Sequence, residues 1–158
     1  FLKIFVNLII YKALQLRGAK ILFLTCNRGL ELCETFSIRT PNGGCQYCDI
    51  VNNFIVSKMG FKVVKLNNLL SSKSLEKIVA LSFDLANENP DIYLYKGVNI
   101  VPVVKDSLMR YYYGAPQSDN LILRKCYETA LKSIESAEII NNKYRPDAVL
   151  SHMGAYAE

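Results

Sequence analysis

Apolar runs of strand length, set between segments with helical spacing, constrain the fold of this chain more than any other feature. Residues 19–26 read AKILFLTC and residues 61–66 read FKVVKL. The first of these is a continuous apolar run, typical of a parallel strand that is buried on both faces, and the second is predicted to be another strand. Helix-like segments precede, separate and follow the two runs. The alternation predicts an α/β domain with a parallel sheet and helices on both faces.

The expected elements follow from periodicity and capping signals. Helices are predicted within 1–18, 49–60, 71–90 and 118–143, with a shorter one from Asp106 and a last strand over 145–152. Gly18 is the expected end of the first helix, and Asp49 and Gly60 are the expected caps of the second. The inner faces are expected to be formed by Phe5, Leu8, Ile9, Ala13 and Leu16; by Leu75, Ile78, Val79, Ser82, Leu85 and Ala86; and by Leu123, Tyr127, Ala130, Ile134 and Ala137.

Composition limits the class of protein. The chain has 158 residues, 51% of them hydrophobic, and a net charge of +5 without a long run of like charges. These values fit one globular domain over 1–158 and argue against a nucleic-acid-binding surface. A weakly basic surface favours nucleotide phosphates, acidic sugars or an anionic membrane face. Lys3, Asn7 and Lys12 interrupt the apolar start before it could span a membrane, and no signal-peptide cleavage site follows it.

Four of the five cysteines lie in one loop, residues 26–48. Cys26, Cys33, Cys45 and Cys48 have the spacing C-x6-C-x11-C-x2-C, of which only the last pair has the form of a zinc knuckle. Four thiolates would select zinc or an iron–sulfur cluster. Two disulfides, buried thiols and a redox pair are the alternatives. Cys126 is alone in the long helix and is expected to pack in the core.

Two further segments carry candidate chemistry. The only histidine, His152, is placed at the end of the predicted last strand, where it could act as a general base, with Gly154 beside it allowing close approach of a ligand. In DSLMRYYYG, residues 106–114, Arg110 could bind a phosphate or carboxylate and the tyrosines could stack on a sugar or a base. The structural alternatives are a histidine bonded to a backbone carbonyl and an arginine paired with an acid. No dinucleotide-binding, Walker or nucleophile-elbow motif is present.

Several phrases resemble one enzyme family. They are Leu14, Leu16, Arg17 and Gly18; Cys26 and Asn27; Cys33, Cys45 and Cys48; Ser107, Arg110 and Tyr111; and Pro146, Asp147, His152, Gly154 and Tyr156. Together they resemble the N-terminal domain of GT-B-type glycosyltransferases of surface and capsule polysaccharide biosynthesis. Met153 departs from the pattern, since the family usually has its histidine and glycine adjacent.

The resemblance implies a fold and a function. It implies a Rossmann-like domain that lacks its first strand, and an acceptor-binding half that needs a C-terminal donor domain, so that this chain alone would be inactive. A sugar would move from a nucleotide donor to a glycan or lipid-linked acceptor, in the cytoplasm or at the inner face of the membrane. His152 would be the base, and Asn27, Arg110, Gly154 and Tyr156 would contact the acceptor. Any metal on the cysteines would be structural. The alternative is a non-catalytic α/β module with a structural metal or a redox-active cysteine loop.

Overall fold

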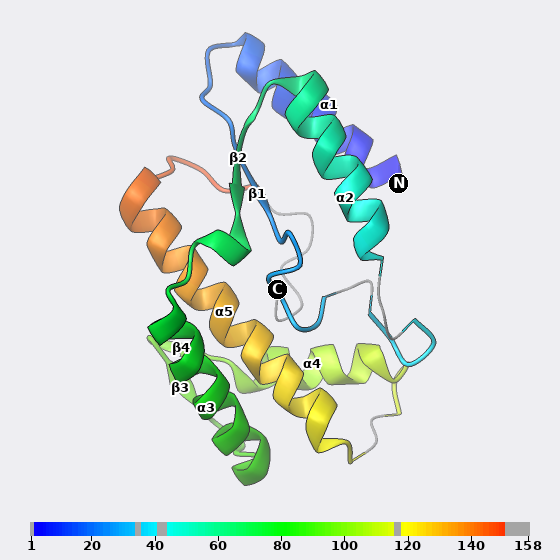
Figure 1. Cartoon of the computed structure of the whole chain (residues 1–158), viewed down its shortest axis with the longest axis vertical. Helices are drawn as coiled ribbons and strands as arrows, with labels where there is room; N and C mark the ends of the chain where they lie inside the picture. The colour runs from blue at the N-terminus through cyan, green and yellow to red at the C-terminus, as the bar shows by residue number, and fades with distance from the viewer. Residues whose placement is uncertain (1, 34–35, 41–43, 116–117, 151–158) are drawn as a thin grey trace.

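The computed structural model describes residues 2–33, 36–40, 44–115 and 118–150 (Figure 1). Among them it contains five α-helices, two short strand pairs, a π-helical turn and a 3-10 turn. In chain order the elements are α1 (Leu2–Leu16), β1 (Leu22–Thr25), α2 (Cys45–Phe54), η1 (Ile55–Met59), β2 (Lys62–Lys65), η2 (Leu66–Asn68), α3 (Ser72–Glu88), β3 (Leu94–Tyr95), β4 (Val98–Asn99), α4 (Val101–Tyr111) and α5 (Asn120–Tyr144).

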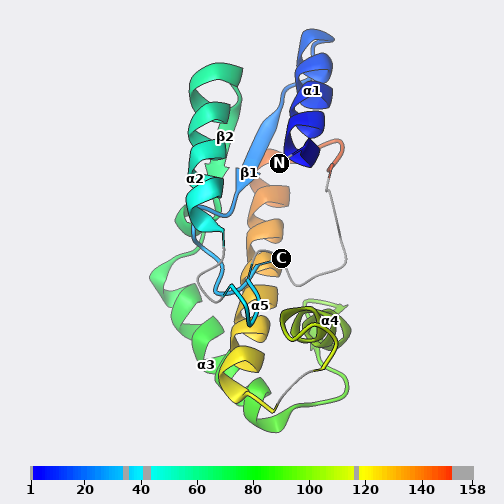
Figure 2. The same ribbon diagram turned by 90° about the vertical axis from the view of Figure 1, so that its right-hand side faces the viewer.

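A parallel pair of strands confirms the predicted α/β class. β1 and β2 pair in parallel, with Leu22 opposite Lys62, and β3 and β4 form a separate antiparallel hairpin. One face of the β1–β2 pair is covered by α1 and α2, whereas α5 crosses on the other side (Figure 2). The covered face holds a small apolar cluster centred on Leu8, Ile55 and Phe61. The β1–β2 pair therefore lies between two layers of helix, α1 and α2 on one face and α5 on the other, and the carboxyl ends of both strands lie next to α5 (Figure 2).

A larger apolar core joins the three later helices. Ile78 and Leu85 of α3, Val104 of α4, and Tyr127 and Leu131 of α5 are all buried in it. In Figure 1, α3 and α4 lie on either side of the lower half of α5. Burial of these side chains, at roughly 25 cal/mol per Å² of apolar surface, is the main force that holds α5 in place. The core thus fixes α5, whose upper half in Figure 1 can support the segments that contact it.

Glycines predicted two helix ends correctly, and a third helix starts at a local cap that was not predicted. Gly18 has a left-handed φ of 93°, and the N–H of Ala19 donates to the carbonyl of Leu14, as in a Schellman motif. Gly60 ends η1 with a φ of 66°. Ser71 caps α3 by accepting a hydrogen bond from the N–H of Ser74 at 3.1 Å. The two glycine ends depend on residues within one turn, which explains why sequence alone locates them.

Other boundaries differ from the prediction. α2 begins at Cys45 after Gly44, so Asp49 is inside the helix and is not its N-cap. α4 begins at Val101, five residues before Asp106, with Pro102 in its first turn, where proline is well tolerated. Neither helix has a side-chain cap hydrogen bond at its start. No polar residue therefore marks either start in the sequence, and both helices begin earlier than predicted.

The predicted last strand is wrong for the part that the structure describes. Residues 145–150 contain no strand, and Val149 and Leu150 are exposed. Without burial, the apolar side chains contribute little toward the entropy cost of ordering a strand. The expected inner face of α1 is also only partly correct, since Leu8 is buried but Ile9 and Leu16 are exposed. Leu24 of β1 is 46% exposed, so β1 is not buried on both faces.

No helix in the described part of the chain has the length and apolar character needed to cross a bilayer.

Candidate functional site

A strained turn follows β1 at its carboxyl end. Asn27 and Arg28 have left-handed φ angles of 47° and 61°, and the N–H of Gly29 donates to the carbonyl of Cys26 at 2.9 Å. Asparagine tolerates this region, but for most L-residues it costs roughly 1–2 kcal/mol. Such strain persists only where neighbouring contacts hold it, and it is frequent at functional sites. The predicted ligand residue Asn27 therefore lies in a conformationally constrained turn.

Gly29 brings this turn against the segment that follows β2. A Cβ atom at Gly29 would lie 2.8 Å from the backbone nitrogen of Asn67 and 2.8 Å from Cδ2 of Leu66. A side chain at this position would force the neighbouring segment to shift, so the close approach favours glycine. The carboxyl ends of the two parallel strands consequently meet at one place. In parallel α/β sheets this edge is where ligands generally bind.

An ion pair joins the turn to α2. Nη2 of Arg28 donates to Oδ2 of Asp49 at 2.5 Å, and this hydrogen bond raises the pKa of Arg28. Because the Arg28 side chain is largely exposed, the pair positions the two segments more than it stabilises them. Asp49 directly follows Cys48, so the contact also fixes the start of α2 relative to Cys26.

The four loop cysteines gather between β1 and α2. Cys26 follows β1, Cys33 lies in the loop, and Cys45 and Cys48 occupy the first turn of α2. None of them forms a disulfide. Partial burial raises the pKa of the Cys48 thiol, and so do the nearby Cys33, Cys45 and Cys26. The predicted set is therefore brought within electrostatic range of one member, Cys48.

The arrangement of the thiols is not that of a ready metal site. Among the described residues, no group of three or more His, Cys, Asp or Glu side chains is placed to hold a metal ion. A zinc ion needs sulfur ligands at about 2.3 Å in a tetrahedron. Binding of zinc or an iron–sulfur cluster would require the four sulfur atoms to move closer together. The metal site remains a prediction for Cys26, Cys33, Cys45 and Cys48.

Arg110 anchors the cysteine loop. Its Nη2 atom donates to the carbonyl of Cys33 at 2.7 Å and to the carbonyl of Phe36 at 3.0 Å. Next to it, the hydroxyl of Tyr113 donates to Oγ of Ser37 at 3.2 Å. Hydrogen bonds from a guanidinium to two carbonyls hold a loop in one conformation. The segment that the sequence presents as a ligand clamp thus contacts the loop itself, and contact of Arg110 with a substrate stays a prediction.

The remaining predicted site residues, His152, Gly154 and Tyr156, lie outside the described residues. Their roles as base and acceptor contacts stay predictions.

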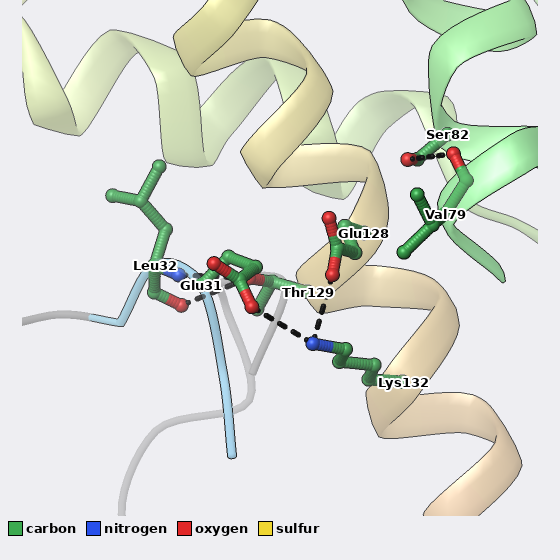
Figure 3. A network of polar contacts seen from close by, with 7 residues as sticks. All are labelled: Glu31, Leu32, Val79, Ser82, Glu128, Thr129 and Lys132. Atoms are coloured by element: carbon green, nitrogen blue, oxygen red, sulfur yellow. Dashed lines mark hydrogen bonds and ion pairs between the residues drawn. The ribbon is translucent and has the colours of Figure 1, made fainter. Parts of the chain in front are cut away.

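A buried polar network, missed by the sequence reasoning, ties the loop to α5 (Figure 3). The N–H of Leu32 donates to Oγ1 of Thr129 at 3.0 Å, and that hydroxyl donates back to the carbonyl of Leu32 at 3.1 Å. Lys132 pairs with Glu128 at 2.8 Å and with Glu31 at 2.9 Å. Burial lowers the pKa of Lys132, but the hydrogen bonds to Glu128 and Glu31 outweigh it, and the net shift is upward.

One signal for this network was present in the sequence. Glu128 and Lys132 are four residues apart on a predicted helix, a spacing that allows an ion pair. Such pairs are usually solvent-exposed, so the spacing alone does not place them inside. Thr129 and the carbonyl of Leu32 are separated by 97 residues, and no local pattern predicts their contact.

A pocket of about 470 Å³ lies where β1 ends above α5. Leu24, Cys26 and Leu30 line it from the β1 side, and residues of α5 line it from below. Its size is within the range of small-molecule sites, roughly 300–1,000 Å³. The strained turn, the cysteine loop and this pocket therefore share the carboxyl edge of the parallel strands.

Comparison of the chain with protein-family models, curated proteins and solved structures finds no match.

Proposed function

We propose that this chain is the acceptor-binding domain of a glycosyltransferase, which moves a sugar from a nucleotide donor to a surface-glycan acceptor. The observation that carries the proposal is the constrained Asn27–Arg28 turn at the carboxyl ends of β1 and β2. This is the edge at which parallel α/β sheets bind ligands. The resemblance of Leu16, Arg17 and Gly18, followed by Cys26 and Asn27, supports the same function.

The proposal includes the finer fold and its partners. The two described parallel strands would belong to a Rossmann-like sheet completed by a strand from outside this chain, and a C-terminal domain would bind the nucleotide sugar. Transfer would take place in the cytoplasm or at the inner face of the membrane, with a glycan or lipid-linked molecule as acceptor.

Different residues would bind the acceptor and remove its proton. The Asn27 amide would hydrogen-bond an acceptor hydroxyl, and His152 would remove the proton of the attacking hydroxyl, since a histidine titrates near neutral pH. Gly154 and Tyr156 would contact the acceptor beside His152. Arg110, whose guanidinium is bonded to the carbonyls of Cys33 and Phe36, would act by holding the loop in place.

The test uses the protein in which this chain is joined to a donor domain, with extracted surface glycan as acceptor and a panel of nucleotide sugars. Asn27→Gly is the informative variant, because glycine keeps the left-handed backbone and removes only the amide. Loss of one hydrogen bond of about 1 kcal/mol should raise the acceptor KM roughly fivefold and leave the donor KM unchanged. Asn141→Ala, at an exposed position on α5, is the matched control.

The outcomes separate the proposal from its failure. His152→Gln should abolish transfer while acceptor binding is retained, which is the pattern of a lost base. Absence of transfer with every nucleotide sugar, together with no glycan binding by the wild-type protein, would refute the function. An acceptor KM that Asn27→Gly leaves unchanged would refute the role of Asn27.

A second function is favoured by one observation: the C-x2-C pair occupies the first turn of α2. The dipole at a helix N-terminus favours thiolates, but partial burial and the neighbouring cysteines raise the pKa of the Cys48 thiol. The spacing of the pair and its closeness to Cys26 and Cys33 are what suit this position to metal binding or redox work. The chain would then be a non-catalytic α/β module with a structural zinc or iron–sulfur cluster, or with a redox-active cysteine loop.

Elemental analysis with a parallel thiol count distinguishes these forms. One zinc or one cluster per chain supports the metal, and a reversible loss of two thiols on oxidation supports the redox pair. Four thiols that stay reduced and bind no metal would exclude both. Cys126→Ala is the control, since that thiol is buried in the core.

A further inference from the structure

The pocket above α5 has mostly aliphatic walls. Nine of its twelve described lining residues are aliphatic, and the other three are Cys26, Ser133 and Ser136. No charged side chain is among those described residues. A charged group would lose its hydration there without gaining a partner, which is costly. The wall composition therefore selects a neutral ligand with an aliphatic body.

Two serines on α5 are the polar residues of the wall. Ser136 is only 1% exposed, and the Oγ atoms of both Ser133 and Ser136 are buried without a hydrogen-bond partner among the described residues. A buried hydroxyl left without a partner costs about 1–3 kcal/mol. Such groups usually find a partner, so the two orphaned hydroxyls require an explanation.

The position of the serines explains them as one site. Residues three apart lie on neighbouring parts of a helix surface, with Cβ atoms roughly 5–6 Å apart. Both residues line the same pocket. Both Oγ atoms are closed to solvent in this structure, so a rotation of each side chain about χ1 is needed to turn the two hydroxyls toward a single oxygen atom of a ligand, one donating and the other accepting if that oxygen belongs to an alcohol.

We propose that this pocket binds a small neutral aliphatic molecule that carries one hydroxyl or carbonyl oxygen, and that Ser133 and Ser136 hydrogen-bond that oxygen. The aliphatic body lies against Leu30 and Ile134, and the open rim at Leu24 and Ala137 admits it. The inference does not depend on sugar transfer, because it uses only the pocket and its walls.

The test is a titration of the full chain with 1-octanol, followed by the NMR signals of the isoleucine and leucine methyl groups. Saturable shifts are expected at Leu30, Ile134 and Ile100, all of which line the pocket. The double variant Ser133→Ala/Ser136→Ala should weaken 1-octanol binding about fivefold to tenfold, the loss expected for a net hydrogen bond. Ser72→Ala, at an exposed serine of α3, is the matched control.

A second variant blocks the pocket by volume. Ala137→Phe places a ring at the exposed rim, where the fold tolerates it, and should abolish the saturable shifts. Ala80→Phe, at an exposed alanine of α3 away from the pocket, should leave them unchanged. The double serine variant should be as stable as the wild type or more stable, because it removes unpaired buried hydroxyls.

The site is refuted if folded wild-type protein shows no saturable shift, or if Ala137→Phe leaves binding unchanged. Equal affinity of the wild type and the double serine variant would refute the role of the hydroxyls. Binding that appears only after residues 151–158 are deleted would assign the pocket to the chain's own terminus and would also overturn the proposal.

Discussion

Replacing Lys132 by methionine should destabilise this protein far more than the loss of an ordinary surface lysine. The Lys132 side chain is 8% exposed and that of its partner Glu128 is 6% exposed, with 2.8 Å between Nζ and Oε1. Methionine keeps most of the aliphatic volume but removes the charge. The variant therefore leaves the carboxylate of Glu128, one turn earlier on the same helix, buried without the ammonium group that neutralises it in the wild type.

The expected cost is about 3–5 kcal/mol, the usual penalty for breaking a buried ion pair by removing one partner. With a urea m-value of about 2 kcal/mol/M, the unfolding midpoint should fall by roughly 2 M. The double variant Glu128→Leu/Lys132→Met removes both charges, and its stability should lie within about 1 kcal/mol of the wild type. Most of the loss in the single variant is thus attributed to the stranded carboxylate.

Equilibrium unfolding in urea at pH 7, followed by circular dichroism, measures all three proteins. Lys105→Met is the control, because Lys105 and Asp91 form a pair whose side chains are 52% and 97% exposed, and it should cost less than about 1 kcal/mol. A single Lys132→Met variant within 1 kcal/mol of the wild type would refute the buried pair. A double variant as unstable as the single one would show that lost packing is the cause.

The pH dependence of the same pair has a definite sign. The pKa of Lys132 is raised in the folded state, so its contribution is fully present below the unfolded value of about 10.4. It is lost as the pH rises through the folded value. The difference in stability between the wild type and Lys132→Met should therefore shrink in strongly alkaline solution.

Three further predictions concern packing, titration and capping. Gly29→Ala should cost about 1–3 kcal/mol in thermal unfolding, because its Cβ would lie 2.8 Å from the backbone nitrogen of Asn67; an unchanged melting temperature would contradict the close approach. Burial raises the pKa of Cys126 from 9.0 to about 12, so stability should fall as the pH rises across that window, since only the unfolded thiol ionises there. Cys126→Ala should show a smaller fall in urea unfolding between pH 8 and 11. Asp119→Ala should destabilise α5 by about 1–2 kcal/mol, and Asp119→Asn by less, because Asp119 accepts hydrogen bonds from two backbone N–H groups of its first turn; equal losses would exclude capping as the cause.

Sequence reasoning succeeded where the determining contacts are local. The ends at Gly18 and Gly60 depend on neighbours within one turn, and both were predicted. The start of α3 lies one residue inside the predicted range 71–90, although Ser71 was not identified as its cap. The parallel pairing of β1 with β2 followed from two apolar runs separated by a helix. The α/β class could therefore be predicted from spacing alone.

The start of α2 could not be predicted from the sequence, because this helix has no polar side-chain cap. Asp49 is a good N-cap residue, but α2 begins four residues earlier, after Gly44, and Asp49 is used instead to pair with Arg28. The change matters for the site, because it places Cys45 and Cys48 on the first turn of a helix. The apolar residues 148–150 led to the prediction of a strand over 145–152. No strand forms over the described residues 145–150, because no neighbouring segment buries Val149 and Leu150.

The role of Arg110 could not be predicted, because it depends on contacts across the whole fold. Its bond to the carbonyl of Cys33 joins residues 77 apart, and the bond between Leu32 and Thr129 joins residues 97 apart. Together with the Arg28–Asp49 pair, these contacts fasten the described parts of the cysteine loop to α2, α4 and α5 without using a thiol. A metal ion bound by the four cysteines would therefore draw their sulfur atoms together within a loop whose described backbone is already held by these contacts.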